Sequence, residues 1–117
     1  MQNYKKLMVW EESHKLVLQL YRITKLFPKE EQFGLTSQLR RTAVSVPANI
    51  AEGCGCYTQN DTARFFQIAL ASLHESEYYI LLAKDLDYVN AVEFKNLISL
   101  SNNIKAMLIA LIKKVKA

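Results

Sequence analysis

Apolar residues recur along the chain at steps of three and four, the spacing that places side chains on one face of a helix. This spacing predicts helices over residues 9–27, 33–52 and 91–115, and another that starts at a cap at 60 or 61 and ends at 85. The predicted core stripes, in chain order, are Leu16, Leu20, Ile23 and Phe27; Leu35, Leu39, Ala43, Val46 and Ile50; Phe66, Ala69, Leu73, Ser76, Ile80 and Ala83; and Phe94, Leu97, Ser101, Ile104, Leu108, Leu111 and Val115.

Local signals mark where these helices begin and end. Pro28 disfavours helical geometry at the residue before it, and Gly53 and Gly55 are typical of the end of a helix. Asn60 or Asp61 supplies a side-chain oxygen to cap the third helix. The segments between the predicted helices are short, so sequential helices should pack as antiparallel neighbours. We predict an all-α fold, an up-and-down antiparallel four-helix bundle that forms a single domain over residues 1–117.

A proline interrupts the second predicted helix without interrupting its apolar spacing. Pro47 cannot donate to the carbonyl of Ala43, which costs about 3 kcal/mol in a helix interior. Because the stripe continues through it, we expect one continuous but bent helix, whose small residues let neighbouring backbones come close. The side chain of Ser45 or Asn49 is expected to bond carbonyls that the proline leaves unpaired.

The third and fourth helices carry more apolar surface than one stripe requires. Ile68 lies beside the stripe of the third helix, and Leu100 and Met107 flank that of the fourth. Exposed apolar patches of that size are unusual on a monomer. The surplus predicts that copies of the chain pack against each other.

The charge of the chain is mildly positive and unevenly placed. Lys and Arg number 15 and Asp and Glu number 11, a net charge of +4. No acid follows Glu93, so the end of the fourth helix is basic and attracts phosphates or an acidic partner. The alternative is a solvated helix end whose lysines complement the helix dipole.

The sequence shows no signal peptide and no apolar stretch of the roughly 20 residues that a membrane span requires. Cys54 and Cys56 are too close together for an ordinary disulfide, which agrees with a reducing compartment. We expect a cytoplasmic protein without a membrane partner.

Three arrangements of polar residues resemble parts of catalytic or metal sites. Glu11 and His14 form one Glu-x-x-His unit, but a di-metal bundle site needs two. The two cysteines with His74 lack the paired spacing of a zinc site. A set of serines near His74 and Glu75 has no nucleophile elbow beside it. We therefore predict no catalytic residue, no metal site and no cofactor.

Arginine and lysine side chains are the better candidates for a binding site. Adjacent residues on a helix diverge by about 100°, so Arg40 and Arg41 cannot both face the core. The planar guanidinium binds two phosphate oxygens together. The predicted nucleic-acid-binding residues are Arg40, Arg41, Arg64, Lys113, Lys114 and Lys116.

Three stretches carry a resemblance to a known family: "LRRTAVSVPANIAEG", "RFFQIALASLHESE" and "LLAKDLDYV". They resemble the four-helix-bundle proteins encoded inside bacterial 23S rRNA intervening sequences, to which the accessory variability determinant of diversity-generating retroelements is similar. The resemblance covers residues 10–112. The positions that match the family pattern are Arg40, Arg41, Ser45, Pro47, Asn49, Glu52, Gly53, Arg64, Ser72 and Glu75.

The resemblance implies a ring-shaped homopentamer with no known catalytic activity. The retroelement relatives bind nucleic acid and a reverse transcriptase through basic ring surfaces. For members like this chain, the resemblance suggests an association with rRNA mainly through genetic location. Two positions depart from the pattern: Cys56 stands where a basic residue is common, and Ser76 where a leucine is usual. The first removes a charge from the candidate surface, and the second is expected to weaken local core packing.

Together these observations predict a non-enzymatic homo-oligomeric bundle that binds rRNA or another nucleic acid. The alternative is a protein-interaction scaffold that does not contact nucleic acid and serves an acidic or nucleoprotein partner.

Overall fold

Four α-helices make up most of the computed structural model, which describes residues 2–117. Two short 3₁₀ turns accompany them, and the described residues contain no strand. The elements, in chain order, are η1 (Tyr4–Lys6), α1 (Met8–Thr24), η2 (Lys29–Glu31), α2 (Leu35–Cys54), α3 (Gln59–Asp85) and α4 (Ala91–Lys116). The all-α fold class predicted from the sequence is confirmed.

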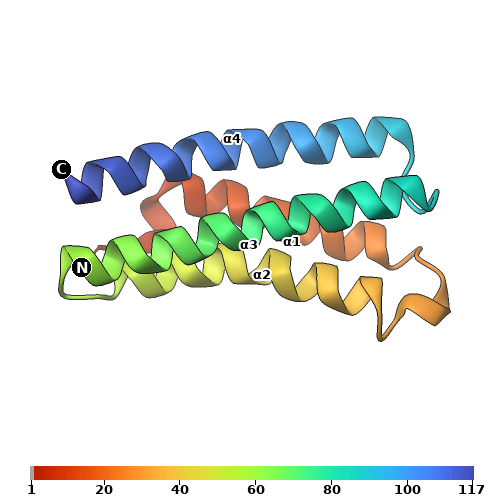
Figure 1. Ribbon diagram of the computed structural model, residues 1–117, viewed down its shortest axis with the longest axis horizontal. Coiled ribbons are helices and arrows are strands. Elements are labelled where there is room, and N and C mark those ends of the chain that lie inside the picture. Colours follow the sequence, from red (N-terminus) through yellow and green to blue (C-terminus); the bar gives the residue numbers. More distant parts are fainter. Residues whose placement is uncertain (1) are drawn as a thin grey trace.

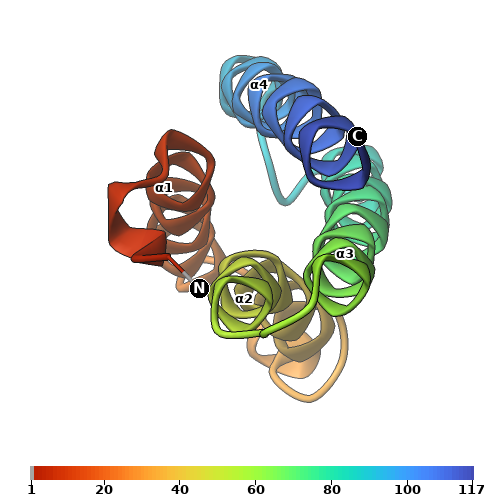
Figure 2. The same ribbon diagram turned by 90° about the vertical axis from the view of Figure 1, so that its left-hand side faces the viewer.

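Each helix runs antiparallel to the one before it (Figure 1). Contacts join α1 to α2, α2 to α3 and α3 to α4, and α4 closes the bundle against α1. In the end view, η1, the α2–α3 connection and the C-terminus all lie at one end (Figure 2). The arrangement is the predicted up-and-down four-helix bundle, and one cluster of buried residues from all four helices forms its core.

The predicted stripes supply that core. Every stripe residue of α2 and of α3 is buried, including Ser76. In the other stripes, Ile23, Phe94, Leu111 and Val115 are half-buried and pack against the core from its edge. Helical periodicity alone therefore located the inward faces of the bundle.

The helix ends differ from the predicted ones in several places. The cap of α3 is Thr58, whose Oγ1 accepts from the backbone N–H of Asp61 at 3.2 Å, so the predicted cap at Asn60 or Asp61 was wrong. Gly53 does not end α2 but lies buried inside its last turn, and Gly55 is the residue that caps the helix. The first helix ends at Thr24, three residues before the predicted end at Phe27.

The second helix is continuous through Pro47, as predicted. The amide of Asn49 donates to the Ser45 carbonyl and to Ser45 Oγ, each at 2.8 Å. Asn49 thus bonds a backbone carbonyl beside the proline, although not the Ala43 carbonyl that lacks its usual donor. The bend at Pro47 stays a prediction.

Helices α2 and α3 share the most extensive contact of the bundle, and serine and threonine hydroxyls bond each other across it. Ser45 Oγ lies 2.9 Å from Ser72 Oγ, and Ser76 Oγ donates to Thr42 Oγ1 at 3.1 Å. Ser76, expected to be a weak point, instead joins the two helices by a buried hydrogen bond. A Cβ at Gly53 would stand 2.8 Å from the ring of Phe66, so the close approach requires glycine there.

At the opposite end of the bundle, Glu31 holds the start of α2. Its Oε1 accepts from the backbone N–H of Leu35 at 3.1 Å, and its Oε2 accepts from the hydroxyl of Tyr88 at 3.0 Å. That hydrogen bond raises the pKa of Tyr88. One carboxylate therefore caps a helix and ties it to the α3–α4 connection, where Asp87 adopts a positive φ of 63°.

A polar contact joins α3 to α4 in the middle of the bundle. Ser101 Oγ donates to Glu77 Oε1 at 2.6 Å, and Lys105 Nζ lies 2.9 Å from Oε1 and 3.2 Å from Oε2. Burial opposes the charged carboxylate, but the hydrogen bonds from Ser101 and Lys105 and the charge of Lys105 outweigh burial. The pKa of Glu77 is therefore lowered from its ordinary value of 4.5.

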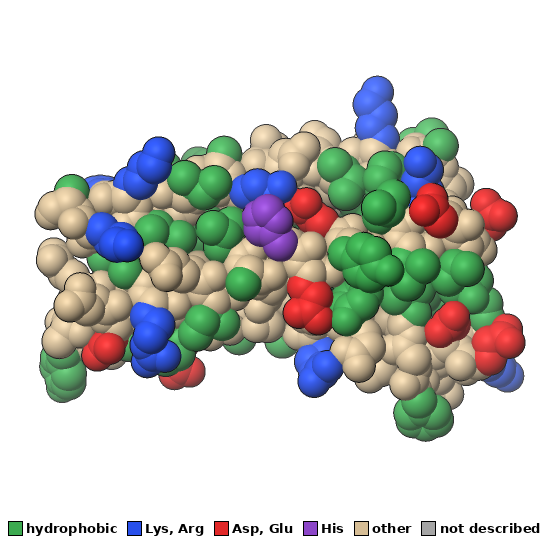
Figure 3. All heavy atoms as spheres, in the orientation of Figure 1, with side chains coloured by type: hydrophobic (Ala, Val, Ile, Leu, Met, Phe, Trp, Pro, Cys, Tyr) green, Lys and Arg blue, Asp and Glu red, His purple; other side chains and the backbone are tan. Residues whose placement is uncertain are grey.

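The surplus apolar residues are only partly covered. Leu100 and Met107 are half-buried and pack against the core, whereas Tyr78 and Leu81 of α3 are 58% and 42% exposed. Hydrophobic side chains gather over the C-terminal part of α3, on the right of the face in Figure 3. Among residues 2–117, no helix combines the length and the hydropathy needed to cross a membrane.

We predict that Glu77→Gln destabilises the protein by about 1–2 kcal/mol at neutral pH, because the charge-assisted contacts with Lys105 are lost. Because the pKa of Glu77 is lower in the folded protein than in the unfolded chain, its charge stabilises the fold at pH values above the unfolded-state pKa. This contribution disappears as the pH falls through the folded-state pKa. Urea unfolding at several pH values should therefore show the two proteins converging below about pH 4.

The control for this prediction is Glu12→Gln, because the ion pair of Glu12 with Lys15 is long, at 3.6 Å, and more exposed. It should change stability by less than about 0.5 kcal/mol. A constant difference between wild type and Glu77→Gln from pH 7 to pH 3 would contradict the assignment.

Candidate nucleic-acid interface

The six predicted contact residues lie in two separate regions of the bundle. Lys113, Lys114 and Lys116 are exposed in the last turn of α4, and Arg64 is exposed in the second turn of α3 at the same end. Arg40 and Arg41 lie near the start of α2. At 1.5 Å per residue, Arg41 is about 20 Å from the end of that helix. The structure therefore does not bring the two arginines of α2 together with the other four cations.

Arg40 is half-buried and binds within the protein. Its Nε donates to Thr24 Oγ1 at 2.8 Å and its Nη2 donates to the Tyr21 carbonyl at 3.3 Å. The guanidinium also lies 4.5 Å from the centre of the Tyr21 ring. These three contacts fasten α2 to the end of α1, so most of the binding capacity of Arg40 is already used.

Arg41 points to the other side of α2 and is exposed. Its Nη2 donates to the side chain of Gln38. On the facing side of α3, the hydroxyl of Tyr79 donates to Glu75 Oε2 at 3.0 Å. That hydrogen bond raises the pKa of Tyr79, whereas the charge of Arg41 acts in the opposite direction. Arg41 thus lies on the side of α2 that faces Tyr79 and is open to solvent.

The second region gains two lysines that sequence reasoning did not include. Lys5 and Lys6 are exposed in η1, which packs against α1 and α2 at the end where α4 finishes. Leu7 and Lys114 line the same surface groove, and the backbone N–H of Gln2 donates to the Cys54 carbonyl at 3.1 Å. These contacts bring the start of the chain beside the end of α2 and the last turns of α4.

We name this region the basic end. It consists of Lys5, Lys6, Arg64, Lys113, Lys114 and Lys116. Four acids, Glu11, Glu12, Glu52 and Asp61, lie in the helix turns at the same end. The six cations thus outnumber the acids there, and the excess makes the basic end attractive to phosphate groups. The predicted topology could have indicated that Lys5 and Lys6 belong to this region, because a bundle with an even number of antiparallel helices places both chain ends at the same end.

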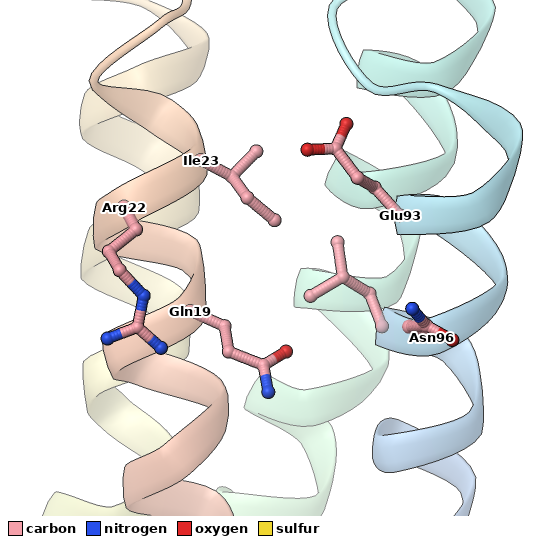
Figure 4. A pocket seen from close by; sticks show the side chains of 6 residues that line it. Gln19, Arg22, Ile23, Glu93 and Asn96 are labelled. Atoms are coloured by element: carbon pink, nitrogen blue, oxygen red, sulfur yellow. The ribbon is translucent and has the colours of Figure 1, made fainter.

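An open hollow of about 460 Å³ lies elsewhere, between α1 and α4. Gln19 and Ile23 point into it from α1, and Glu93 points into it from α4 (Figure 4). One oxygen of Glu93 already accepts from the backbone N–H of Asn90, where it completes the cap of α4. The hollow is an open groove beside a helix cap.

The polar groups of the interior serve the packing of helices. Ser13 and Thr24 donate to carbonyls of their own helix at 2.6 Å. Cys54 is buried, and burial raises the pKa of its thiol, as does the neighbouring Cys56. Both thiols are free. Residues 2–117 contain no group of three or more His, Cys, Asp and Glu side chains placed to hold a metal ion.

Comparison with known proteins identifies the family of the chain and solved structures with a similar fold. The model of the family described as 23S rRNA-intervening sequence protein matches residues 5–110. No curated protein matches the chain. A crystal structure of a protein with unknown function, from the S23 ribosomal protein family of Bacteroides thetaiotaomicron VPI-5482, superposes with a TM-score of 0.82 at 24% sequence identity. The match covers 90% of this chain and 95% of that one, and it shows a shared fold.

The two adjacent arginines of α2 should differ in what they do for folding. We expect Arg40→Ala to lower the free energy of unfolding by about 1–2 kcal/mol, because it removes two hydrogen bonds and a cation–π contact. Arg41→Ala should change it by less than about 0.5 kcal/mol. Thermal and urea denaturation followed by circular dichroism measure both.

Arg40→Lys provides a further control, since lysine keeps the charge but lacks the planar fork. It should recover only part of the loss. Equal stability of the Arg40→Ala and Arg41→Ala proteins would show that the contacts of Arg40 do not stabilise the fold.

Proposed function

This chain belongs to the family of 23S rRNA-intervening sequence proteins, and on that premise we propose that it is a non-enzymatic, self-associating cytosolic bundle that binds structured RNA through its basic end. The observation that carries the proposal is the convergence of six cations from three elements, η1, α3 and α4, at one end of the molecule. Membership of the family suggests RNA as the ligand, and the positive side chains of the basic end would bind its phosphates.

Phosphate contacts account for this mode of binding. Each lysine or arginine that neutralises a phosphate releases a counterion, so binding is strong at low salt and weakens steeply as salt is added. Such contacts position a nucleic acid without reading its bases. One chain carries a net charge of only +4. Self-association would repeat the basic end and add weak contacts together through effective concentration.

The use of interior polar groups supports a non-enzymatic role. Thr42 and Ser76 bond each other, Ser101 bonds Glu77, and Thr24 accepts from Arg40. All of these side chains join helices to one another, and Glu31 and Glu93 cap helices. These interior hydroxyls and carboxylates are thus engaged in holding the bundle together.

Exposed apolar residues support self-association. Tyr78 and Leu81 are adjacent on the outer side of α3, and Ile109 of α4 is 38% exposed. The family resemblance implies a ring of five copies, and we propose that this α3–α4 surface lies between subunits. The same surface favours the alternative function, a scaffold for a different protein, which would not depend on the basic end.

The double variant Tyr78→Glu, Leu81→Glu tests the assembly. Charges at two adjacent apolar positions should yield a smaller particle in light scattering at micromolar concentration, because burying them between subunits is costly. Leu18→Glu is the control, since Leu18 is 44% exposed on α1. It should leave the particle size unchanged. A wild-type protein that is already monomeric would exclude self-association.

The triple variant Lys113→Gln, Lys114→Gln, Lys116→Gln tests the nucleic-acid interface. Mobility shifts of labelled structured RNA across a salt series should show weaker binding. The slope of log K against log salt should be shallower by about two to three, because roughly one unit is lost for each phosphate contact.

A matched control removes three exposed cations from the other end, with Lys25→Gln, Lys29→Gln and Lys95→Gln. It changes the net charge equally and should leave most of the binding intact. Equal losses in the two triple variants would show attraction by net charge without a basic interface. No shift by the wild-type protein at low salt would favour the scaffold.

A further inference from the structure

One aromatic side chain at the basic end has no packing partner. Tyr57 lies in the connection between α2 and α3 and is 92% exposed. That connection lies at the same end of the bundle as η1 and the end of α4 (Figure 2). An aromatic ring is thus exposed to solvent at the same end of the bundle as the candidate interface.

The turn that carries Tyr57 is fixed on both sides. Before it, the backbone N–H of Cys56 donates to the Gly53 carbonyl at 3.2 Å. After it, Thr58 caps α3, and Thr62 Oγ1 donates to the same Gly53 carbonyl at 2.9 Å. The backbone that carries the ring is therefore held by the meeting of two helices, so that little backbone freedom remains to be lost on binding.

Folding does not account for an aromatic residue at this position. The residue before a helix cap often packs against an apolar side chain at the fourth helical position, which fixes the entry of the chain. In α3 that fourth position is Thr62, whose hydroxyl is already bonded to the Gly53 carbonyl. Tyr57 consequently has no apolar partner and contributes an exposed ring.

We propose that Tyr57 stacks on an unpaired base of the bound RNA, an inference that rests on the proposed function. The class of ligand is then RNA with a loop, a bulge or a frayed end, and not a continuous duplex. Bases inside an A-form duplex are stacked on each other and closed to side chains, whereas unpaired bases stack on exposed aromatic rings. The surrounding cations hold the phosphates that flank the stacked base.

Charge distinguishes Tyr57 from the other strongly exposed ring of the molecule. Phe33 is 90% exposed in the connection between α1 and α2, at the opposite end, where Glu30 and Glu31 balance Lys25 and Lys29. That connection therefore offers phosphate no excess of positive charge. Phe33 matches Tyr57 in exposure but does not lie at an end with surplus cations, which makes it the appropriate control.

The experiment measures dissociation constants by fluorescence anisotropy for the full chain with two labelled RNAs of equal charge. One is a hairpin with an unpaired loop, and the other is a blunt, fully paired duplex. Tyr57→Ala should weaken hairpin binding about tenfold, since stacking on one base is worth a factor of this size, and should leave duplex binding unchanged within about twofold. Tyr57→Trp should restore hairpin binding, and Phe33→Ala should affect neither RNA.

Two results would overturn the inference while the proposed function stands. One is an unchanged affinity of Tyr57→Ala for the hairpin, and the other is an equal loss for hairpin and duplex. If the wild-type protein binds neither RNA at low salt, the proposed function fails and the inference fails with it. Circular dichroism confirms that the variants are folded, which their exposed positions lead us to expect.

Discussion

The close approach of α2 and α3 is the constraint on which the rest of the molecule depends. At Gly53 a single added carbon would collide with the Phe66 ring at 2.8 Å and with the Thr62 carbonyl at 3.1 Å. Small residues and serine hydroxyls continue the contact along both helices, so the backbones stay near each other over its length. Because the two helices meet so tightly, the backbone of the turn between them has few conformations available.

That rigidity matters because the basic end is assembled from distant parts of the sequence. The cations of η1 and of α4 come from opposite ends of the chain, and Arg64 comes from its middle. Its guanidinium lies 4.6 Å from the centre of the Phe65 ring, which restricts its motion. The bond from the Gln2 N–H to the Cys54 carbonyl attaches the start of the chain to the end of α2. The bundle thus acts as a frame that sets the spacing of charges which the sequence holds far apart.

The fold was largely predictable, and the site much less so, for physical reasons. Periodicity identified the buried stripes because burial of apolar surface dominates helix packing, and it carried correctly through Pro47. It failed at helix ends, where a single side-chain bond decides between Thr58 and the neighbouring candidate caps. Arg40 resembled a surface cation in the sequence because its partners, Thr24 and Tyr21, are remote along the chain. Lys5 and Lys6 joined the site through topology, which residue spacing does not encode.

The contact between α1 and α4 is narrower than those between consecutive helices, and a groove lies at each end of it. Consecutive helices pair through short loops, whose closure costs little entropy, whereas joining α1 to α4 requires the whole chain to come together. During folding, we expect the hairpin of α2 and α3 to form first and α4 to close on α1 in a late step. The same weakness makes this seam the first to open in the native state, so its amide hydrogens should exchange with solvent faster than those of α2 and α3.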